Sequence, residues 1–417
     1  MKGRGKYFKL RRFINWAIAI QGGLLWVCSY LQSWVLTFLY ASTLSEQKWK
    51  RNEILAQVYF QRRFRNPQAI NVFFKKTLRV CVTYRCNLKC NYCYARGIET
   101  QIPEDMKLKD FFNLVIWAKE KKWKGIRFLG GEPTIHPEFI QMLDICYQHQ
   151  MNVTMSSNNL FSHEIVSKFE KPWISYVSLN YSPDVLNDKQ KSLFKENLKR
   201  LKEKKIPFEL SCVLGYRNEG ISEILEDARV FRPICIRASI AIPGLAKQIS
   251  VEDLTADFKT ISAKLFRLQD NCIKSNLPFY IYRPIMPCLF SREEWKKLKG
   301  IFRFTCFTRC PLGIMGDYSA TVVVNPDLST FPCAVTFVKG PSILTFKNKK
   351  EISDFYQREI KNRLSDPLME ACNNCQRRES FLDDLIKGEK SDLKNSYKES
   401  LCQGGCLSFK QASCGPC

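Results

Sequence analysis

Acidic residues and histidine are both scarce in this chain. Its 417 residues include 40 Asp and Glu against 65 Lys and Arg, a formal net charge of +25, and three histidines. The sequence also lacks internal repeats and low-complexity tracts, and 45% of its residues are hydrophobic, which excludes a largely disordered protein. The length allows two domains, or one barrel with appendages.

The positive charge is concentrated at the N-terminus. Residues 1–76 hold 14 Lys and Arg against two acids, Glu46 and Glu53, so this segment carries +12 of the +25. Such an excess suits nucleic acid, anionic lipid or an acidic peptide. It is also the composition of an ordinary lysine-rich, solvated surface.

An uncharged stretch, residues 13–45, lies within this basic segment. It is long enough to span a bilayer, but Gln21, Gly22 and Gly23 interrupt it, and basic residues flank it on both sides. A helix or helical hairpin lying on an anionic membrane surface suits both flanks. A helix docked on the protein's own body and a true span are the alternatives. A cleaved signal peptide fits poorly, because its apolar region is shorter.

From Leu78 onward, short β-branched or apolar runs alternate with segments of helical period. The predicted strands are Leu78–Thr83, Ile126–Leu129, Asn152–Met155, Ile174–Leu179, Phe208–Val213 and Ile234–Ile242. Helices are predicted between them, for example over Leu108–Lys121, Pro137–Gln148 and Lys189–Lys204. Six such units predict an α/β fold, a partial (β/α)6 TIM-type barrel with its active site at the C-terminal ends of the strands.

Beyond the sixth strand the chain becomes irregular. Helices are predicted over Val251–Gln269 and Ser291–Lys299, and a hairpin over Ala320–Asn325 and Thr330–Cys333. We therefore expect three parts: a basic, partly apolar helical extension (1–76), a barrel (77–290) and an irregular cysteine-rich domain (300–417).

Cysteine is abundant, with 19 residues. The chain is too large and hydrophobic to need a disulfide framework, and the count is odd. Twelve cysteines fall into groups at 86–93 and from 306 to the end, which indicates metal or iron–sulfur ligation in a reducing compartment. The others are expected to be mostly buried packing thiols: Cys28, Cys81, Cys146, Cys212, Cys235, Cys272 and Cys288.

The first group, Cys86, Cys90 and Cys93, directly follows the first predicted strand. Thiolates separated by three and two residues can hold three corners of a cubane cluster and leave the fourth iron open to a substrate. Zinc is the alternative. It favours a fourth Cys or His, and the nearest histidine, His136, lies far along the chain. The spacing alone leaves both open.

Cys86, Cys90 and Cys93, with Tyr92 before the last of them, resemble the signature of the radical S-adenosylmethionine (SAM) superfamily. The resemblance implies a catalytic [4Fe-4S] cluster whose open iron binds the methionine part of SAM. It also implies reductive cleavage of SAM to a 5′-deoxyadenosyl radical, which abstracts hydrogen from the substrate. The electron comes from a donor such as flavodoxin or ferredoxin.

A second feature supports this resemblance, since Phe128–Thr134 reads Phe-Leu-Gly-Gly-Glu-Pro-Thr at the end of the second predicted strand. In the family this strand end approaches the amino group of SAM, and glycine lets backbone come close to a ligand. By resemblance, the SAM contacts are Gly130, Gly131, Glu132, Pro133, Ser157, Asn158, Ser178, Asn180 and Arg237. Each of the last five is equally suited to capping its strand. No catalytic side chain is assigned.

The C-terminal cysteines resemble the SPASM extension of radical SAM enzymes, which carries two auxiliary [4Fe-4S] clusters. The core of the match is Cys372-x2-Cys375 followed by Cys402-x3-Cys406. By resemblance, the first cluster takes Cys306, Cys310, Cys333 and Cys406, and the second takes Cys372, Cys375, Cys402 and either Cys414 or Cys417. The 26 residues between Cys375 and Cys402 exceed the family's usual gap, and Ala334 stands where sulfatase-maturing relatives have an acid. One auxiliary cluster could therefore be incomplete, and zinc-ribbon packing is the alternative.

This resemblance implies a radical SAM enzyme, an oxidoreductase-type maturase that modifies a peptide or protein side chain with help from auxiliary clusters. Residues 13–45 favour a first alternative, modification of a lipid or small cofactor at the membrane surface. The other is a non-catalytic iron–sulfur or zinc protein that binds nucleic acid. The motif Gly130–Thr134 disfavours it, so nucleic acid is not an expected partner. We expect a cytoplasmic protein, peripheral on the inner face of the membrane if residues 13–45 bind lipid.

Overall fold

The computed structural model describes residues 77–90, 93, 102–170, 173–214, 220–240, 251–281, 322–332 and 339–361. The chain divides into two compact units, Met1–Gln57 and Val58–Cys417, and every described residue belongs to the second. The predicted N-terminal extension, the predicted helix Ser291–Lys299 and the nine cysteines from Cys306 to Cys417 lie outside the described residues. In the described part, no helix is long and apolar enough to cross a membrane.

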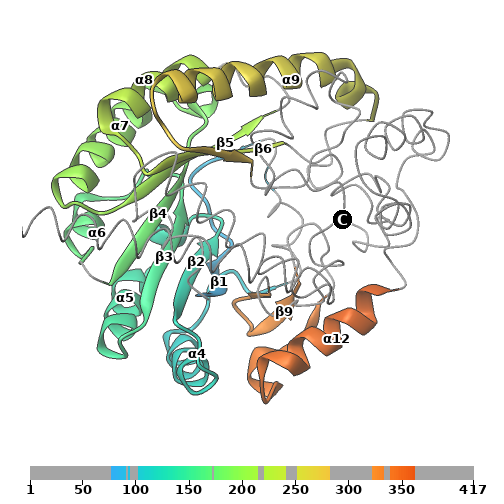
Figure 1. The fold of residues 1–417 in the computed structure, drawn as a ribbon. Helices are drawn as coiled ribbons and strands as arrows, with labels where there is room; N and C mark the ends of the chain where they lie inside the picture. Colours follow the sequence, from blue (N-terminus) through green and yellow to red (C-terminus); the bar gives the residue numbers. More distant parts are fainter. Residues whose placement is uncertain are drawn as a thin grey trace, which may run out of the picture. The chain divides into compact units, whose positions relative to one another are not determined.

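The core is a ten-stranded sheet of order β10-β9-β8-β1-β2-β3-β4-β5-β6-β7 (Figure 1). Its strands are β1 (Thr77–Thr83), β2 (Gly125–Gly130), β3 (Asn152–Ser157), β4 (Ile174–Asn180), β5 (Phe208–Leu214), β6 (Cys235–Ile240), β7 (Phe279–Ile281), β8 (Val323–Val324), β9 (Ser329–Phe331) and β10 (Gly340–Ser342). From β1 to β7 each strand runs parallel to the next. The sheet is open, with β7 and β10 at its two edges.

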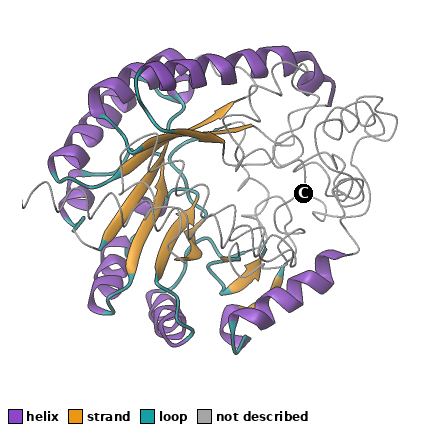
Figure 2. Ribbon diagram, in the orientation of Figure 1, coloured by secondary structure: helices purple, strands orange, loops and turns teal. Residues whose placement is uncertain are grey.

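Helices follow the strands along the chain and cover one face of the sheet (Figure 2). They are α4 (Leu108–Glu120), α5 (Phe139–Gln148), α6 (His163–Ser167), α7 (Asp188–Glu203), α8 (Ile221–Phe231), α9 (Val251–Lys274) and α12 (Lys349–Lys361). The six β-then-α units confirm the predicted partial (β/α)6 barrel. Short strand β7 and helix α12 were not predicted, and α9 continues beyond Gln269 to Lys274.

Helix α7 shows how local sequence produces these elements. The Asn187 side chain accepts a hydrogen bond from the Gln190 N–H, and the Gln190 side chain accepts one from the Asn187 N–H. This capping box starts the helix. Phe194, Leu198 and Leu201 then recur at helical spacing and are completely buried, so they form the face that packs on the sheet.

The two faces of the sheet differ in polarity, because alternate residues of a strand point to opposite sides. The helix-covered face is apolar and buried; it includes Val80, Phe128, Met155, Val177 and Leu210. The alternate residues of β2 to β6 form the opposite face, called the inner face below. Its polar members are Arg127, Thr154, Ser156, Tyr176, Ser178, Asn180, Glu209, Ser211, Arg237 and Ser239.

The predicted hairpin is present as β8 and β9, which pair antiparallel. Its unpredicted property is that β8 also pairs parallel with β1. The Tyr84 hydroxyl, just beyond β1, donates to Asn325 Oδ1 at 2.6 Å in a buried contact. The end of β1 is therefore joined to a segment about 240 residues later in the chain.

Candidate active site

The cysteine loop begins three residues after β1. Cys86, Cys90 and Cys93 form no disulfide in the described structure, and the Cys93 N–H donates to the Cys90 carbonyl at 3.3 Å. Cys86 is an exposed residue, but its thiol is partly buried. This burial is the main cause that raises the pKa of Cys86 to about 11; a hydrogen bond from the Leu88 N–H opposes the rise, and Glu132, Cys93 and Cys90 add to it. The three thiols are thus close enough to influence one another electrostatically.

The end of β2 lies directly against the backbone that leads into this loop. The Gly131 N–H donates to the Thr83 carbonyl and the Glu132 N–H to the Arg85 carbonyl, both at 2.8 Å. A Cβ atom on Gly130, whose φ is +151°, would lie 2.1 Å from the Thr83 oxygen. One on Gly131 would lie 2.2 Å from the Arg85 oxygen. These glycines therefore admit the backbone of Thr83 and Arg85, and their predicted contact with a ligand stays a prediction.

Glu132 joins the ends of β2 and β3 through a completely buried carboxylate. Its Oε1 accepts from the Thr134 N–H (3.2 Å), the Thr134 hydroxyl (2.6 Å) and the Ser157 hydroxyl (2.9 Å). Its Oε2 accepts from the Asn158 N–H at 2.7 Å. Burial raises the pKa of Glu132, and these hydrogen bonds oppose that rise. Both carboxylate oxygens therefore accept from protein donors, which fix the carboxylate between the ends of β2 and β3.

Asn158 connects this network to the cysteine loop. Its side-chain amide donates to Asn87 Oδ1 at 2.6 Å and lies 4.0 Å from the Cys86 sulfur. The structure therefore brings five predicted contact residues to the base of the cysteine loop: Gly130, Gly131, Glu132, Ser157 and Asn158. Pro133 is buried beside them, at the start of a 3-10 turn, Pro133–Ile135.

The other predicted contacts, Ser178, Asn180 and Arg237, lie elsewhere on the inner face. Arg237 donates to the Ser211 hydroxyl through Nε (3.0 Å) and Nη2 (2.8 Å). Its Nη1 lies 3.3 Å from Oε1 of buried Glu209. Arg237 precedes the end of β6 by three residues, about 10 Å at the usual rise of a strand. The structure thus places it below the strand ends, bound to β5.

Ser178 lies on β4, between Ser156 of β3 and Glu209 of β5, and its backbone pairs with both. The side chain is 1% exposed, and its hydroxyl makes no hydrogen bond in the described structure. Asn180 ends β4 and is half-buried.

The sequence analysis did not predict a role for Arg127 and Glu209, which lie on the inner face. Arg127 donates to the Tyr176 hydroxyl at 2.8 Å and to the Ser156 hydroxyl at 3.0 Å. Glu209 accepts from the Cys235 thiol at 3.6 Å and pairs with Arg237. A signal was present, because each is a charged residue within a predicted buried strand, and a buried charge needs a partner.

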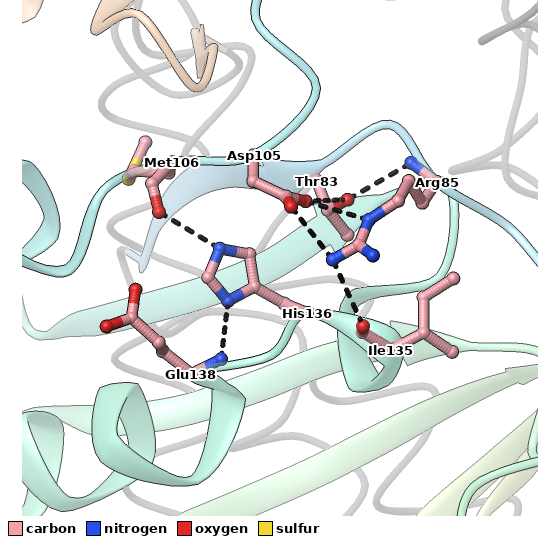
Figure 3. Close-up of polar contacts among 7 residues, drawn as sticks. All are labelled: Thr83, Arg85, Asp105, Met106, Ile135, His136 and Glu138. Carbon is pink, nitrogen blue, oxygen red and sulfur yellow. Dashed lines mark hydrogen bonds and ion pairs between the residues drawn. The ribbon is translucent and has the colours of Figure 1, made fainter.

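The contacts that Arg85, Asp105 and His136 make beside the loop were not predicted either (Figure 3). Arg85 and Asp105 form an ion pair at 2.8 Å. His136 is buried; its Nδ1 accepts from the Glu138 N–H at 3.0 Å, so Nε2 carries the proton and donates to the Met106 carbonyl at 2.9 Å. Both ring nitrogens are therefore occupied, and His136 is not a fourth metal ligand here. Contacts across such sequence separations leave no local signal.

The chemistry of the loop's donors fits an iron–sulfur cluster. A cubane takes each thiolate on a different iron. Three cysteines on one loop fit three corners of a cubane.

Five of the cysteines predicted to be buried packing thiols fall in the described part of the chain, and their burial confirms that prediction. Cys81, Cys146, Cys212, Cys235 and Cys272 are all buried, and none of them forms a disulfide in the described structure. Cys28 and Cys288 lie outside the described residues.

A family comparison identifies the barrel. Residues 80–230 match the family model described as the Radical SAM superfamily, and this part of the chain is a radical SAM domain. Among curated proteins, the chain is similar to GTP 3',8-cyclase of Aliarcobacter butzleri (strain RM4018). The two are 26% identical over 165 residues, which cover 36% of this chain and 50% of that protein.

It is also similar to Fe-coproporphyrin III synthase of Methanosarcina barkeri (strain Fusaro / DSM 804). The identity is 26% over 188 residues, 42% of this chain and 47% of that protein. The chain thus spans about half the length of these two relatives.

Solved structures show the same fold. Native anSMEcpe with bound AdoMet matches with a TM-score of 0.53 and 16% identity, over 81% of this chain and 91% of that one. Streptococcus suis SuiB bound to S-adenosylmethionine matches with a TM-score of 0.52 and 15% identity, over 84% and 81%. These likenesses confirm the partial TIM barrel with an open, mostly parallel sheet.

Changing Glu132→Gln tests the buried carboxylate. An amide offers one acceptor oxygen, so either orientation leaves the backbone N–H of Thr134 or of Asn158 without a partner. We expect a loss of about 1–3 kcal/mol in the free energy of unfolding, measured by urea denaturation. Glu164→Gln, at an exposed position in α6, is the control and should change little. Unchanged stability of Glu132→Gln would contradict this role.

The environment of His136 predicts a pH effect. Burial lowers the pKa of His136 below its ordinary value, against the opposing effects of Met106, Asp105 and Glu138. As the pH falls through about 6.5, the unfolded chain takes up this proton first, so the folded state loses stability. The stability advantage of wild type over His136→Gln should shrink between pH 7.5 and 5.5, by at most about 1.4 kcal/mol per pH unit. A constant difference in urea denaturation would refute this.

Proposed function

We propose that this protein is a radical SAM enzyme, which cleaves SAM reductively and modifies its substrate by hydrogen abstraction. The observation that carries the proposal is the cysteine loop. It presents three cysteines that form no disulfide in the described structure, at the C-terminal edge of a parallel sheet and within a radical SAM domain. When bound, a [4Fe-4S] cluster and SAM supply an electron and a carbon-centred radical.

The chain's own residues hold and orient these groups. Cys86, Cys90 and Cys93 are the cluster ligands in this proposal. Glu132, after β2, and Asn158, after β3, fix the loop. Gly130 and Gly131 are half-buried and lie against the backbone that leads into the loop. The similar structures of anSMEcpe and SuiB hold bound SAM, which supports SAM as the ligand here.

The favoured substrate is a peptide or protein side chain, and the enzyme is then an oxidoreductase-type maturase. Its support is the cysteine pattern from Cys306 to Cys417, which resembles the auxiliary-cluster extension of peptide-modifying relatives. Auxiliary clusters would accept the electron left on the substrate or bind the peptide. The +25 net charge suits an acidic peptide and an acidic electron donor such as flavodoxin or ferredoxin.

A small anionic molecule is the second candidate substrate. The names of the sequence relatives, GTP 3',8-cyclase and Fe-coproporphyrin III synthase, favour it. The inner face of the sheet also carries two arginines, Arg127 and Arg237, beneath the cysteine loop. The alternative of a lipid substrate depends on residues 13–45, which the structure does not describe.

Changing Cys86, Cys90 and Cys93 to Ala tests the proposed enzyme. After anaerobic reconstitution we expect about 12 iron per wild-type chain if both auxiliary clusters form, and about four fewer in the triple variant. The triple variant should release no 5′-deoxyadenosine from SAM under reducing conditions. Cys146→Ala, a buried packing thiol, should keep both iron and cleavage. Zinc in place of iron, with no cleavage by wild type, would refute the proposal.

Isotope transfer distinguishes the two substrate classes. The radical takes its hydrogen from the substrate, so 5′-deoxyadenosine should gain deuterium from a deuterated substrate. We expect transfer from a deuterated peptide, chosen from any short reading frame found beside the gene, and none from deuterated GTP. The reverse result, measured by mass spectrometry, would assign the small-molecule function and refute the peptide one.

A further inference from the structure

The segment that carries the three cysteines has both of its ends fixed against β1. Arg85 immediately precedes Cys86, and Asp105 lies 20 residues later, where the chain returns. Arg85 binds Asp105 through two contacts, Nε to Oδ1 at 3.1 Å and Nη2 to Oδ2 at 2.8 Å. Two planar groups paired in this way fix orientation as well as distance.

Neighbouring contacts hold the same two ends in register. The Tyr84 N–H donates to the Glu104 carbonyl, and the Met106 N–H donates to the Val82 carbonyl, each at 2.8 Å. The Thr83 hydroxyl donates to Asp105 Oδ1 at 2.6 Å. The residues before the loop and those after it thus form a short antiparallel pair at its base.

The turn after Glu132 supports this base from a third side (Figure 3). Arg85 Nη2 also donates to the Ile135 carbonyl at 3.4 Å, and His136 donates to the Met106 carbonyl. The motif that contacts the loop entry through Gly131 and Glu132 therefore also contacts the segment where the loop ends.

The exposure of the ion pair argues that its role is geometric. The side chains of Arg85 and Asp105 are 34% and 31% exposed, and ion pairs this accessible to water contribute little to global stability. Lys191 and Glu223 form a comparable pair between α7 and α8, at 3.1 Å with exposures of 31% and 41%. That pair closes no loop, so it serves as a matched control.

We propose that Arg85 and Asp105 form a clamp that closes the segment 86–104 and positions the cysteine ligands. They are positioning residues, since they act through the loop rather than on the substrate. The inference rests on the proposed function for its link to the cluster. The closed loop itself can be tested without that function.

Hydrogen exchange of the reconstituted full-length chain, followed by mass spectrometry, tests the closed loop. In Arg85→Lys and Asp105→Asn, the amides of Tyr84 and Met106, which pair across the base of the loop, should exchange at least about tenfold faster than in wild type. Lysine keeps the charge but not the paired contacts, so Arg85→Lys should not behave as wild type. Lys191→Met should leave the exchange of these two amides unchanged. Equal exchange in wild type and both clamp variants would overturn the proposal.

Iron release links the clamp to the cluster. The relevant iron is the part that is lost in the Cys86, Cys90 and Cys93 triple variant. A chelator should remove it severalfold faster from Arg85→Lys and Asp105→Asn than from wild type or Lys191→Met. The electron paramagnetic resonance signal of that reduced cluster should broaden in the clamp variants. Unchanged release and spectra, in a wild type that holds this iron, would overturn the positioning role.

Two further results separate the possible failures. If wild type holds no such iron, the proposed function fails, and faster exchange in the clamp variants still supports the closed loop. If either clamp variant fails to fold, Thr83→Val provides the test. It removes the hydroxyl that donates to Asp105 and accepts from the Arg85 N–H, and it keeps the side-chain shape. Wild-type exchange of the Tyr84 and Met106 amides in Thr83→Val would then overturn the clamp.

Discussion

The close contact between the end of β2 and the backbone of Thr83–Arg85 determines where the cysteine loop lies. Gly130 and Gly131 make this contact possible, because any side chain at either position would overlap a carbonyl oxygen of β1. The two backbone hydrogen bonds from Gly131 and Glu132 then fix the residues directly before Cys86. Because the residues before Cys86 are fixed, the positions that the three sulfurs can take are restricted, as ligands of one cluster require.

The buried carboxylate of Glu132 extends this rigidity across the sheet. Removing a carboxylate from water is costly, and four N–H and O–H donors offset that cost here. One of these donors is the backbone of Asn158, whose side chain binds Asn87 in the cysteine loop. The ends of β1, β2 and β3 thus form one hydrogen-bonded unit, and the loop is held on two sides.

Hydrophobic periodicity was sufficient to predict β1 to β6 and the helices α4, α5 and α7, because the apolar residues of each element recur with the period of a strand or a helix. It could not predict that β8 joins the edge of β1, since that pairing depends on residues more than 200 positions apart. The cysteine loop and the motif Gly130–Thr134 were recognisable as local patterns. Asp105 and His136 were not, because their roles arise from contacts with β1 and with the segment 104–106.

The inner face places a limit on how a substrate can bind beneath the loop. Arg127 is engaged by Tyr176 and Ser156, and Arg237 by Ser211 and Glu209. Their donors are largely committed to neighbouring strands, so an anionic group that binds either arginine must compete with existing contacts. The hydroxyl of Ser178, between the two groups, is buried without such a contact. A substrate group that accepts one hydrogen bond there would satisfy an existing deficit, whereas recognition by the arginines requires rearrangement of their partners.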